Sequence, residues 1–403
     1  MLHDTIIDAE QIGNVPDAVL KDLAAAFTRH GFTSANLLSI FGKEVLRHIC
    51  ISFREEDYLR RQVLAGNKVL GTLADLFLLR HPVDAAEARG LLGDAVVASL
   101  TENGILAGME GGKVRCRGYI TPLADRWFLN DGDAHDDHPE HVIKLVLEQP
   151  YLIKTAREAA AAVLAKPTGA VLDFCSGSGV IGQGVQPKGW RVRGLDINPR
   201  AIRYARFNAR LNGAPDTEYI LQDVREGVPP GQFDVALANP PYNAFIAPEG
   251  TESATDLTLH SGRFGEEVYD AILDNLDGVL APGGFFLCCG ITLLKGDRLW
   301  HPLADQLSRN GTVVLLHKPI APVQSWEGMR LQWNCTPDFE KLAPGSIPAA
   351  LRETDAFDNV TWAIMIYQKG GKPGYHTVYN LPTDGVLISP QALRDLRQLF
   401  GLA

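Results

Sequence analysis

The stretch Ala170-Val-Leu-Asp-Phe-Cys-Ser-Gly-Ser-Gly179 joins an apolar strand pattern to a glycine loop. Such a loop lets the backbone approach a ligand closely, and the N-terminus of the helix expected after it offers unpaired N–H groups. The loop has the spacing Asp173-x-Cys175-x-Gly177-x-Gly179-x-x-Gly182. The stretch therefore predicts a strand–loop–helix unit that binds a ligand at the end of the strand.

From residue 155 onward, apolar segments typical of buried strands alternate with helical patterns. The expected strands are 170–174, 191–196, 217–223, 233–238, 284–289, 312–317 and 360–367. The helical patterns include 199–212, 265–280 and a terminal helix at 390–400. This alternation predicts an α/β domain over residues 151–403, a doubly wound, Rossmann-like parallel sheet with helices on both faces.

Residues 1–150 have a different pattern and predict a mainly helical N-terminal domain. Apolar residues recur at helical spacing over 16–27, where Val19, Leu20, Leu23 and Phe27 share one face, and similar runs follow at 57–65, 69–80, 84–92 and 94–102. Residues 114–120 and 125–129 are expected to form two strands of a hairpin-like ribbon. Helices followed by a ribbon resemble a winged helix.

A winged helix suggests DNA binding, but the charge pattern favours another role. The helix that would be the recognition helix, 94–102, contains no Lys or Arg, and helices that bind in the DNA major groove normally need such side chains. The whole chain has 38 basic and 48 acidic residues, a net charge of −10, whereas phosphate contacts favour a basic surface. We therefore expect the N-terminal domain to act as a lid or to shape a substrate site, and nucleic acid is a less expected partner.

Composition narrows the class of protein further. The 403 residues are 46% hydrophobic, and no apolar run is long enough for a membrane span. The first residues lack the basic and then apolar pattern of a secretory signal. The six cysteines are scattered without CxxC spacing, which favours reduced thiols and a cytoplasmic location.

His135, His138 and His141 recur at every third residue in an acidic segment between the two expected domains. They have no cysteine partner, and this spacing on an extended loop does not bring three ligands to one metal ion. We therefore expect no metal site and interpret the segment as a solvated linker.

Three aspartates fall at the carboxyl ends of the expected strands, the edge where open α/β sheets bind ligands. The charge of Asp173 would repel a pyrophosphate but suits the ammonium group of a methionine. Asp196 is placed to accept hydrogen bonds from the two hydroxyls of a ribose, and Asp223 from the amine of an adenine. One such aspartate is often only a helix N-cap, but the set favours S-adenosylmethionine (SAM) over a nicotinamide cofactor. The candidate cofactor-binding residues are Asp173, Cys175, Gly177, Gly179, Asp196, Ile197, Asp223, Val224 and Asn239.

The segment Asn239-Pro240-Pro241-Tyr242 follows the strand expected at 233–238 and provides the candidate catalytic residues Asn239, Pro240 and Tyr242. The Asn239 side-chain oxygen and the Pro240 carbonyl can accept N–H bonds from an acceptor nitrogen and direct its lone pair at a sulfonium carbon. Tyr242 can stack on a planar acceptor or contact the sulfonium. The alternative is an ordinary turn with an incidental aromatic residue.

These motifs resemble those of the class I SAM-dependent methyltransferases. The Asn-Pro-Pro-Tyr sequence is similar to the small-domain branch, which includes release-factor glutamine methyltransferases and exocyclic-amine methyltransferases. The resemblance covers about residues 155–300 and implies SAM as the cofactor and a nitrogen as the acceptor. Residues 243–262 are expected to form a loop over the acceptor pocket, where His260 and Arg263 either contact substrate or are ordinary loop residues.

Several functions fit this sequence. The leading one is methyl transfer from SAM to a nitrogen of a small molecule or a protein. The same pocket would also suit a SAM-cyclising enzyme, in which the α-amine of SAM attacks its own γ-carbon to give azetidine-2-carboxylate and methylthioadenosine. An RNA base methyltransferase and a non-catalytic SAM binder are further alternatives.

Overall fold

The computed structural model describes residues 7–41, 67–132, 140–143, 145–146, 148–214, 216–241, 267–295, 298–300, 306–318, 324–325, 359–380 and 388–402. The chain forms two compact units, each made of separate segments. The first comprises Met1–Pro150, Ser176–Gly184 and Asn198–Tyr219. The second comprises Tyr151–Cys175, Val185–Ile197 and Ile220–Ala403.

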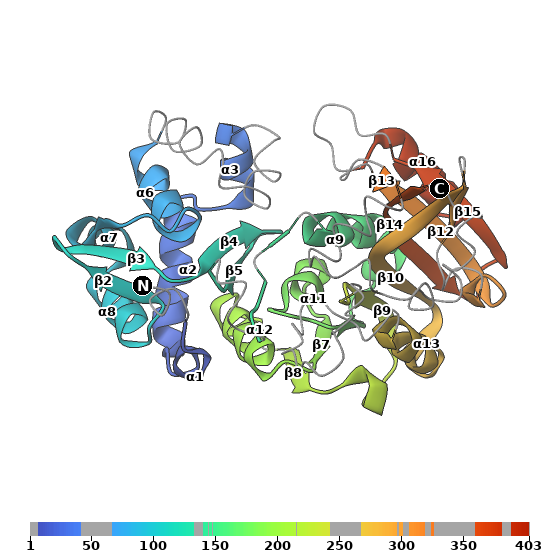
Figure 1. Ribbon diagram of the computed structural model, residues 1–403, viewed down its shortest axis with the longest axis horizontal. Helices are drawn as coiled ribbons and strands as arrows, with labels where there is room; N and C mark the ends of the chain where they lie inside the picture. The colour runs from blue at the N-terminus through green and yellow to red at the C-terminus, as the bar shows by residue number, and fades with distance from the viewer. Residues whose placement is uncertain are drawn as a thin grey trace, which may run out of the picture. The chain divides into compact units, whose positions relative to one another are not determined.

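The first unit is mainly helical (Figure 1). Its helices are α1 (Ala9–Ile12), α2 (Asp17–Arg29), α3 (Ser34–Phe41), α6 (Lys68–Phe77), α7 (Ala85–Leu92), α8 (Asp94–Glu102) and α12 (Pro199–Leu211). The helices expected at 16–27, 69–80, 84–92 and 94–102 correspond to α2, α6, α7 and α8. The run expected at 57–65 lies outside the described residues.

The ribbon of the first unit differs from the sequence expectation. The expected strand 114–120 is two strands, β3 (Lys113–Cys116) and β4 (Tyr119–Leu123), which belong to different sheets. β3 pairs with β1 (Val83–Asp84) and β2 (Leu106–Met109), whereas β4 pairs with β5 (Arg126–Asn130). The chain bends at Gly118, where a Cβ would lie 2.2 Å from the Asn130 carbonyl oxygen.

The core of the first unit forms on the apolar face that the sequence placed on α2. Leu20, Leu23 and Phe27 are fully buried, while Val19 is only partly buried. The Phe27 ring lies 5.2 Å from that of Phe77, edge to face, a geometry favoured between aromatic rings. Buried residues of α12 join the same core. Contact among apolar residues that are distant in the sequence therefore holds these helices together.

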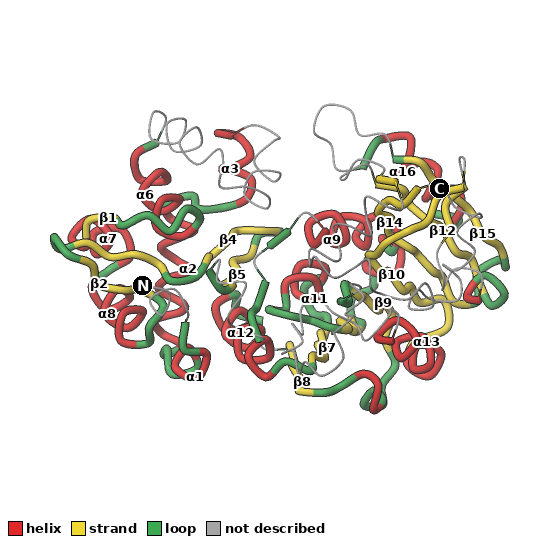
Figure 2. Tube along the Cα trace, viewed as in Figure 1, coloured by secondary structure: helices red, strands yellow, loops and turns green. Residues whose placement is uncertain are grey.

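A ten-stranded mixed sheet forms the centre of the α/β part, and Figure 2 shows its strands in yellow. Its main path runs in the order β15, β12, β14, β10, β9, β6, β7, β8. The bounds are β6 (Ala170–Phe174), β7 (Arg191–Asp196), β8 (Thr217–Leu221), β9 (Phe233–Ala238), β10 (Leu280–Lys295), β12 (Gly311–Lys318), β14 (Asn359–Lys369) and β15 (Gly374–Tyr379), with the short strands β11 (Arg298–Trp300) and β13 (Gln324–Ser325) alongside. The other helices with described bounds are α9 (Glu148–Ala159), α10 (Ala161–Leu164), α11 (Val180–Val185), the 3₁₀ helix η3 (Val224–Glu226), α13 (Glu267–Val279) and α16 (Pro390–Leu399).

The direction of the strands is only partly as the sequence indicated. β6 is parallel to β7 and β9, and β9 is parallel to β10. β14, however, is antiparallel to both β10 and β12. The α/β class is confirmed, but the sheet is mixed rather than parallel. An apolar run shows that a strand is buried and carries no information about its direction.

No helix in the described part of the chain is both long enough and apolar enough to cross a membrane.

Candidate functional site

The ends of three parallel strands lie in register at one edge of the sheet. Phe174 of β6 is paired with Leu195 of β7 and with Ala238 of β9. The next residue along each strand is therefore Cys175, Asp196 or Asn239. The structure thus brings three of the candidate site residues to the same level, because parallel strands end at a common edge.

The charges of the three candidate aspartates act on the Cys175 thiol. Burial raises the pKa of Cys175 well above its usual value, and the Asp196, Asp173 and Asp223 carboxylates raise that pKa further. A backbone bond from Gln222 N to Asp196 O, 2.9 Å long, holds the segment before Asp223 beside β7. This edge therefore carries a concentration of negative charge that favours a cationic ligand.

The side chains at this edge differ in exposure. Asp173 is fully buried and Asp196 is partly exposed. Ile197 is a large apolar residue with 39% of its surface exposed, whereas Val224 is buried. The end of β7 therefore presents a partly exposed carboxylate followed by an exposed apolar side chain.

Asp223 makes the N-cap contact that was the alternative for a single aspartate, and it also forms an ion pair that the sequence did not indicate. Its carboxylate caps η3 by accepting from Arg225 N at 2.9 Å, and it also accepts from Arg225 Nη2 at 2.7 Å. These bonds lower the pKa of Asp223. Asp223 is therefore an N-cap and an ion-pair partner, whichever ligand it also contacts.

The Asn239 side-chain oxygen Oδ1 is buried and has no hydrogen-bond partner among the described residues. Pro240, which follows it, is buried as well. Tyr242, His260 and Arg263 lie outside the described residues, so their roles stay predictions.

The glycine loop has three residues with left-handed backbone: Cys175 (φ 53°), Gly177 (φ 52°) and Gly179 (φ 77°). A Cβ at Gly177 would meet nothing within 4 Å, whereas a Cβ at Gly179 would lie 2.2 Å from the Tyr219 hydroxyl oxygen. The glycine at 179 is thus required by packing as well as by backbone conformation. Gly177 is the position where the loop backbone is open to a close approach.

The sequence did not single out the residues that hold this loop. Ser178, between the two glycines, is hydrogen-bonded by the side chains of Asn130 and Asn208. Asn130 lies at the end of β5 and Asn208 on α12. Isolated asparagines carry no recognisable motif, so only the fold reveals their contacts.

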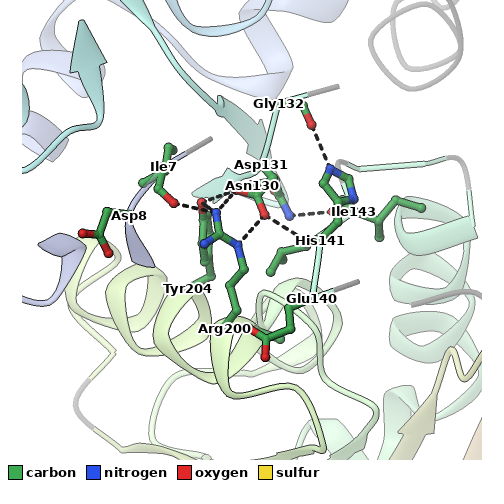
Figure 3. A network of polar contacts seen from close by, with 12 residues as sticks. Ile7, Asp8, Asn130, Asp131, Gly132, Glu140, His141, Ile143, Arg200 and Tyr204 are labelled. Carbon is green, nitrogen blue, oxygen red and sulfur yellow. Dashed lines mark hydrogen bonds and ion pairs between the residues drawn. The ribbon is translucent and has the colours of Figure 1, made fainter. Parts of the chain in front are cut away.

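The histidine segment also differs from its interpretation as a solvated linker. Asp131 and His141 are buried, and the His141 ring donates through Nε2 to the Gly132 carbonyl at 2.8 Å. Figure 3 shows Asp131 facing Arg200 in the same network. His135 and His138 lie outside the described residues. Within the described ranges, no group of three or more His, Cys, Asp or Glu side chains is arranged to hold a metal ion.

Residues 155–256 match the family model of the methyltransferase small domain. Together with the α/β sheet, this match confirms the resemblance of that segment to SAM-dependent methyltransferases.

Three relatives show similarity to part of the chain. A protein of Methanocaldococcus jannaschii, named as a candidate protein N5-glutamine methyltransferase, is 35% identical over 115 residues, which cover 28% of this chain and 57% of that protein. A release factor glutamine methyltransferase of Lactococcus lactis is 31% identical over 121 residues, which cover 28% of this chain and 44% of that protein. A 4-amino-L-phenylalanine/4-methylamino-L-phenylalanine methyltransferase of Streptomyces pristinaespiralis is 33% identical over 125 residues, with 29% and 42% covered. The matches thus span about half the length of these relatives.

Proposed function

We propose that this chain transfers a methyl group from SAM to a nitrogen atom of a protein or a small molecule. The observation that carries the proposal is the buried Asn239 Oδ1, which has no hydrogen-bond partner among the described residues. A buried acceptor without a partner is unfavourable by about 1–3 kcal/mol, so such a group in a native protein calls for a functional explanation. An N–H group of the methyl acceptor would supply the missing bond.

The chemistry of the acceptor explains why an asparagine suits this position. An amide or arylamine nitrogen is a weak nucleophile because its lone pair is delocalised. Bound SAM supplies an electrophilic methyl group on a sulfonium. Asn239 Oδ1 and the Pro240 carbonyl would accept N–H bonds and direct the nitrogen lone pair at that methyl carbon. Pro240 and Pro241 lack N–H groups, so the backbone directly after Asn239 presents carbonyl acceptors and no donors.

The negative edge of the sheet supports a role in binding SAM, whose sulfonium and ammonium groups are positive. We assign Asp173 to the ammonium group, with the open backbone at Gly177 near the methionine end, and Asp196 to the ribose hydroxyls. The exposed Ile197 side chain would cover one face of the adenine. Asp223 accepts four hydrogen bonds from three N–H groups of Arg225, two on each carboxylate oxygen, so an adenine amine would have to replace or share one of them.

The relatives support nitrogen as the acceptor. Two are named for glutamine and one for an amino group on phenylalanine, and both kinds of nitrogen have delocalised lone pairs. The net charge of −10 and the absence of Lys and Arg from α8 support a protein or small-molecule acceptor over a nucleic acid.

The assignment of the two halves of the chain is part of the same proposal. Residues 151–403 form the catalytic domain, and residues 1–150 cover or shape its active site. We further propose a cytoplasmic location. It is supported by the four cysteines in the described residues, none of which forms a disulfide.

A product assay tests the proposed reaction. The protein is incubated with SAM alone, with a glutamine-containing peptide, with 4-aminophenylalanine and with RNA, and the nucleoside product is identified. Adenosylhomocysteine that forms only with the peptide or the amine supports the proposal. Methylthioadenosine without an acceptor supports SAM cyclisation instead. Methylated RNA would show that the methyl acceptor is an RNA base. Binding of SAM without any turnover would identify a non-catalytic binder.

A further inference from the structure

Two asparagines from outside the glycine loop hold its central residue, Ser178. Asn130 Nδ2 donates to Ser178 Oγ at 2.6 Å, and Asn208 Nδ2 donates to the Ser178 carbonyl at 2.9 Å. The two asparagines are 1% and 0% exposed, and Ser178 is 4% exposed. Buried hydrogen bonds of this kind fix geometry, because breaking one leaves its partner unsatisfied.

Both asparagines are themselves fixed by bonds to backbone atoms. The second N–H of the Asn130 amide donates to the Ile143 carbonyl at 2.9 Å, which determines the orientation of the amide (Figure 3). Asn208 accepts from Leu129 N at 2.7 Å and donates to Leu129 O at 3.1 Å. The position of Ser178 is therefore determined in part by the end of β5, 48 residues earlier in the chain.

The loop needs such support because of its backbone. Within the five residues from Cys175 to Gly179, three have positive φ, and one of these three is not a glycine. Residues held in sparsely populated backbone regions persist only where the surrounding structure determines them. Ser178 lies between Gly177 and Gly179, and its hydrogen bonds hold this part of the loop in place.

The C-cap residue of α12, Asn212, is a matched position that has no direct bond to residues 175–179. Asn212, one helical turn after Asn208, bridges β5 in the same way, with bonds of 2.8 Å from Trp127 N and 2.9 Å to Trp127 O. Its other bonds go to the Gln183 side chain and to the helix backbone. Asn212 therefore resembles Asn208 in its contact with β5 and differs in its distance from the cofactor loop.

We propose that Asn130 and Asn208 are positioning residues, which hold the glycine loop in the conformation that binds the methionine end of the cofactor. Asn130, at the end of β5, would thus affect the affinity for the cofactor through its hydrogen bond to Ser178. This inference rests on the proposed function.

The test is a double-mutant cycle with adenosylhomocysteine as the probe, measured by calorimetry. Asn130→Ala and Ser178→Ala should each weaken binding about 3–10-fold, because each removes one hydrogen bond of ordinary strength. The double variant should bind about as weakly as either single variant, because both substitutions remove the same bond. Amide hydrogen exchange of residues 176–179 should quicken in all three. Ser178→Ala, the smallest change, tests the bond even where Asn130→Ala fails to fold.

Asn212→Ala is the control for loss of stability alone. It should lower the free energy of unfolding yet leave the affinity for adenosylhomocysteine within about twofold, since none of its bonds goes directly to residues 175–179 and it is connected to Gly179 only through Gln183 and Tyr219. Unchanged affinity in Asn130→Ala and Ser178→Ala, or losses that simply add in the double variant, would overturn the inference and leave the proposed function standing. A wild-type protein that binds neither SAM nor adenosylhomocysteine would refute the proposed function, and this inference with it.

Discussion

Arg200 and Asp131 form a two-point ion pair inside the first unit. Arg200 Nε lies 2.8 Å from Asp131 Oδ2, and Arg200 Nη2 lies 2.5 Å from Asp131 Oδ1. Both side chains are nearly buried, at 6% and 5% exposed. Asp131 also accepts from the Tyr204 hydroxyl and from Val142 N, and Arg200 donates to the Ile7 carbonyl (Figure 3). The pair therefore connects α12 to the segment after β5 and to the beginning of the described chain.

Removal of one member of this pair should be strongly destabilising. Burial lowers the pKa of Arg200, but the hydrogen bonds and charge of Asp131 outweigh burial, so the pKa lies above its usual value. Arg200 is therefore charged in the folded protein. Asp131→Ala should lower the free energy of unfolding by about 3–5 kcal/mol, because a buried charge is left without its partner. Arg200→Met combined with Asp131→Leu should recover part of the loss. Urea denaturation measures both effects.

A surface pair provides the control for this prediction. Arg89 and Asp94 are 3.9 Å apart and 54% and 91% exposed. Arg89→Gln should therefore change the free energy of unfolding by less than about 1 kcal/mol. If Asp131→Ala were no more damaging than Arg89→Gln, the buried pair would not have the role that its geometry indicates.

The two loop glycines should respond differently to alanine. Both have positive φ, so either substitution forces an L-residue into left-handed backbone, which is unfavourable by about 1–2 kcal/mol. At Gly179 the new methyl group would also lie 2.2 Å from the Tyr219 hydroxyl oxygen. Gly179→Ala should therefore be about 1–3 kcal/mol more destabilising than Gly177→Ala. Equal losses in thermal unfolding would mean that Tyr219 moves aside without effect.

The local pattern of the sequence accounts for much of this fold. The strand 170–174 and the glycine loop were predicted at their observed positions, since a continuous apolar run and closely spaced glycines impose local structure. The register of β6, β7 and β9 then brings the strand-end residues to one edge, as parallel pairing requires. The match of residues 155–256 to the methyltransferase small domain confirms the family resemblance.

What the sequence did not reveal depends on contacts between distant residues. The strand expected at 114–120 is divided because β3 and β4 pair with different strands, and the close Asn130 carbonyl leaves no room for a side chain at Gly118. The direction of β14 likewise depends on its pairing with β10 and β12. The burial of Asp131 depends on Arg200, which is 69 residues away in the chain. An isolated polar residue has no pattern that announces its partner, so the sequence predicted a solvated segment there.

Asp196 and Asn239 should have separable effects on the proposed reaction. Asp196→Ala should weaken SAM binding by about 1–3 kcal/mol if its carboxylate holds the ribose hydroxyls. Asn239→Ala should instead lower turnover far more than SAM affinity, because the proposed function places its oxygen against the acceptor nitrogen and not against SAM. Calorimetry and the product assay measure the two quantities on the same preparations. Equal losses of affinity and turnover in Asn239→Ala would show that Asn239 only shapes the cofactor pocket.

Cys116 should make stability depend on pH above the neutral range. Burial raises the pKa of this thiol from 9.0 to about 12, although the backbone bond with Gly118 and the nearby Arg80 and Arg115 act to lower it. The folded state thus holds the proton more tightly than the unfolded state, so the contribution to stability is complete below pH 9 and is lost between pH 9 and about 12.

At pH 10, the unfolded thiol is largely ionised while the folded one is protonated, which should lower the free energy of unfolding by about 1 kcal/mol relative to pH 8. Cys116→Ala should be less stable at both values, because a fully buried side chain is shortened, but its stability should fall less steeply with pH. Urea denaturation at the two pH values compares the slopes, and parallel slopes for the two proteins would contradict the raised pKa. Iodoacetamide gives an independent readout, because the folded thiol should stay unmodified at pH 8 until denaturant is added.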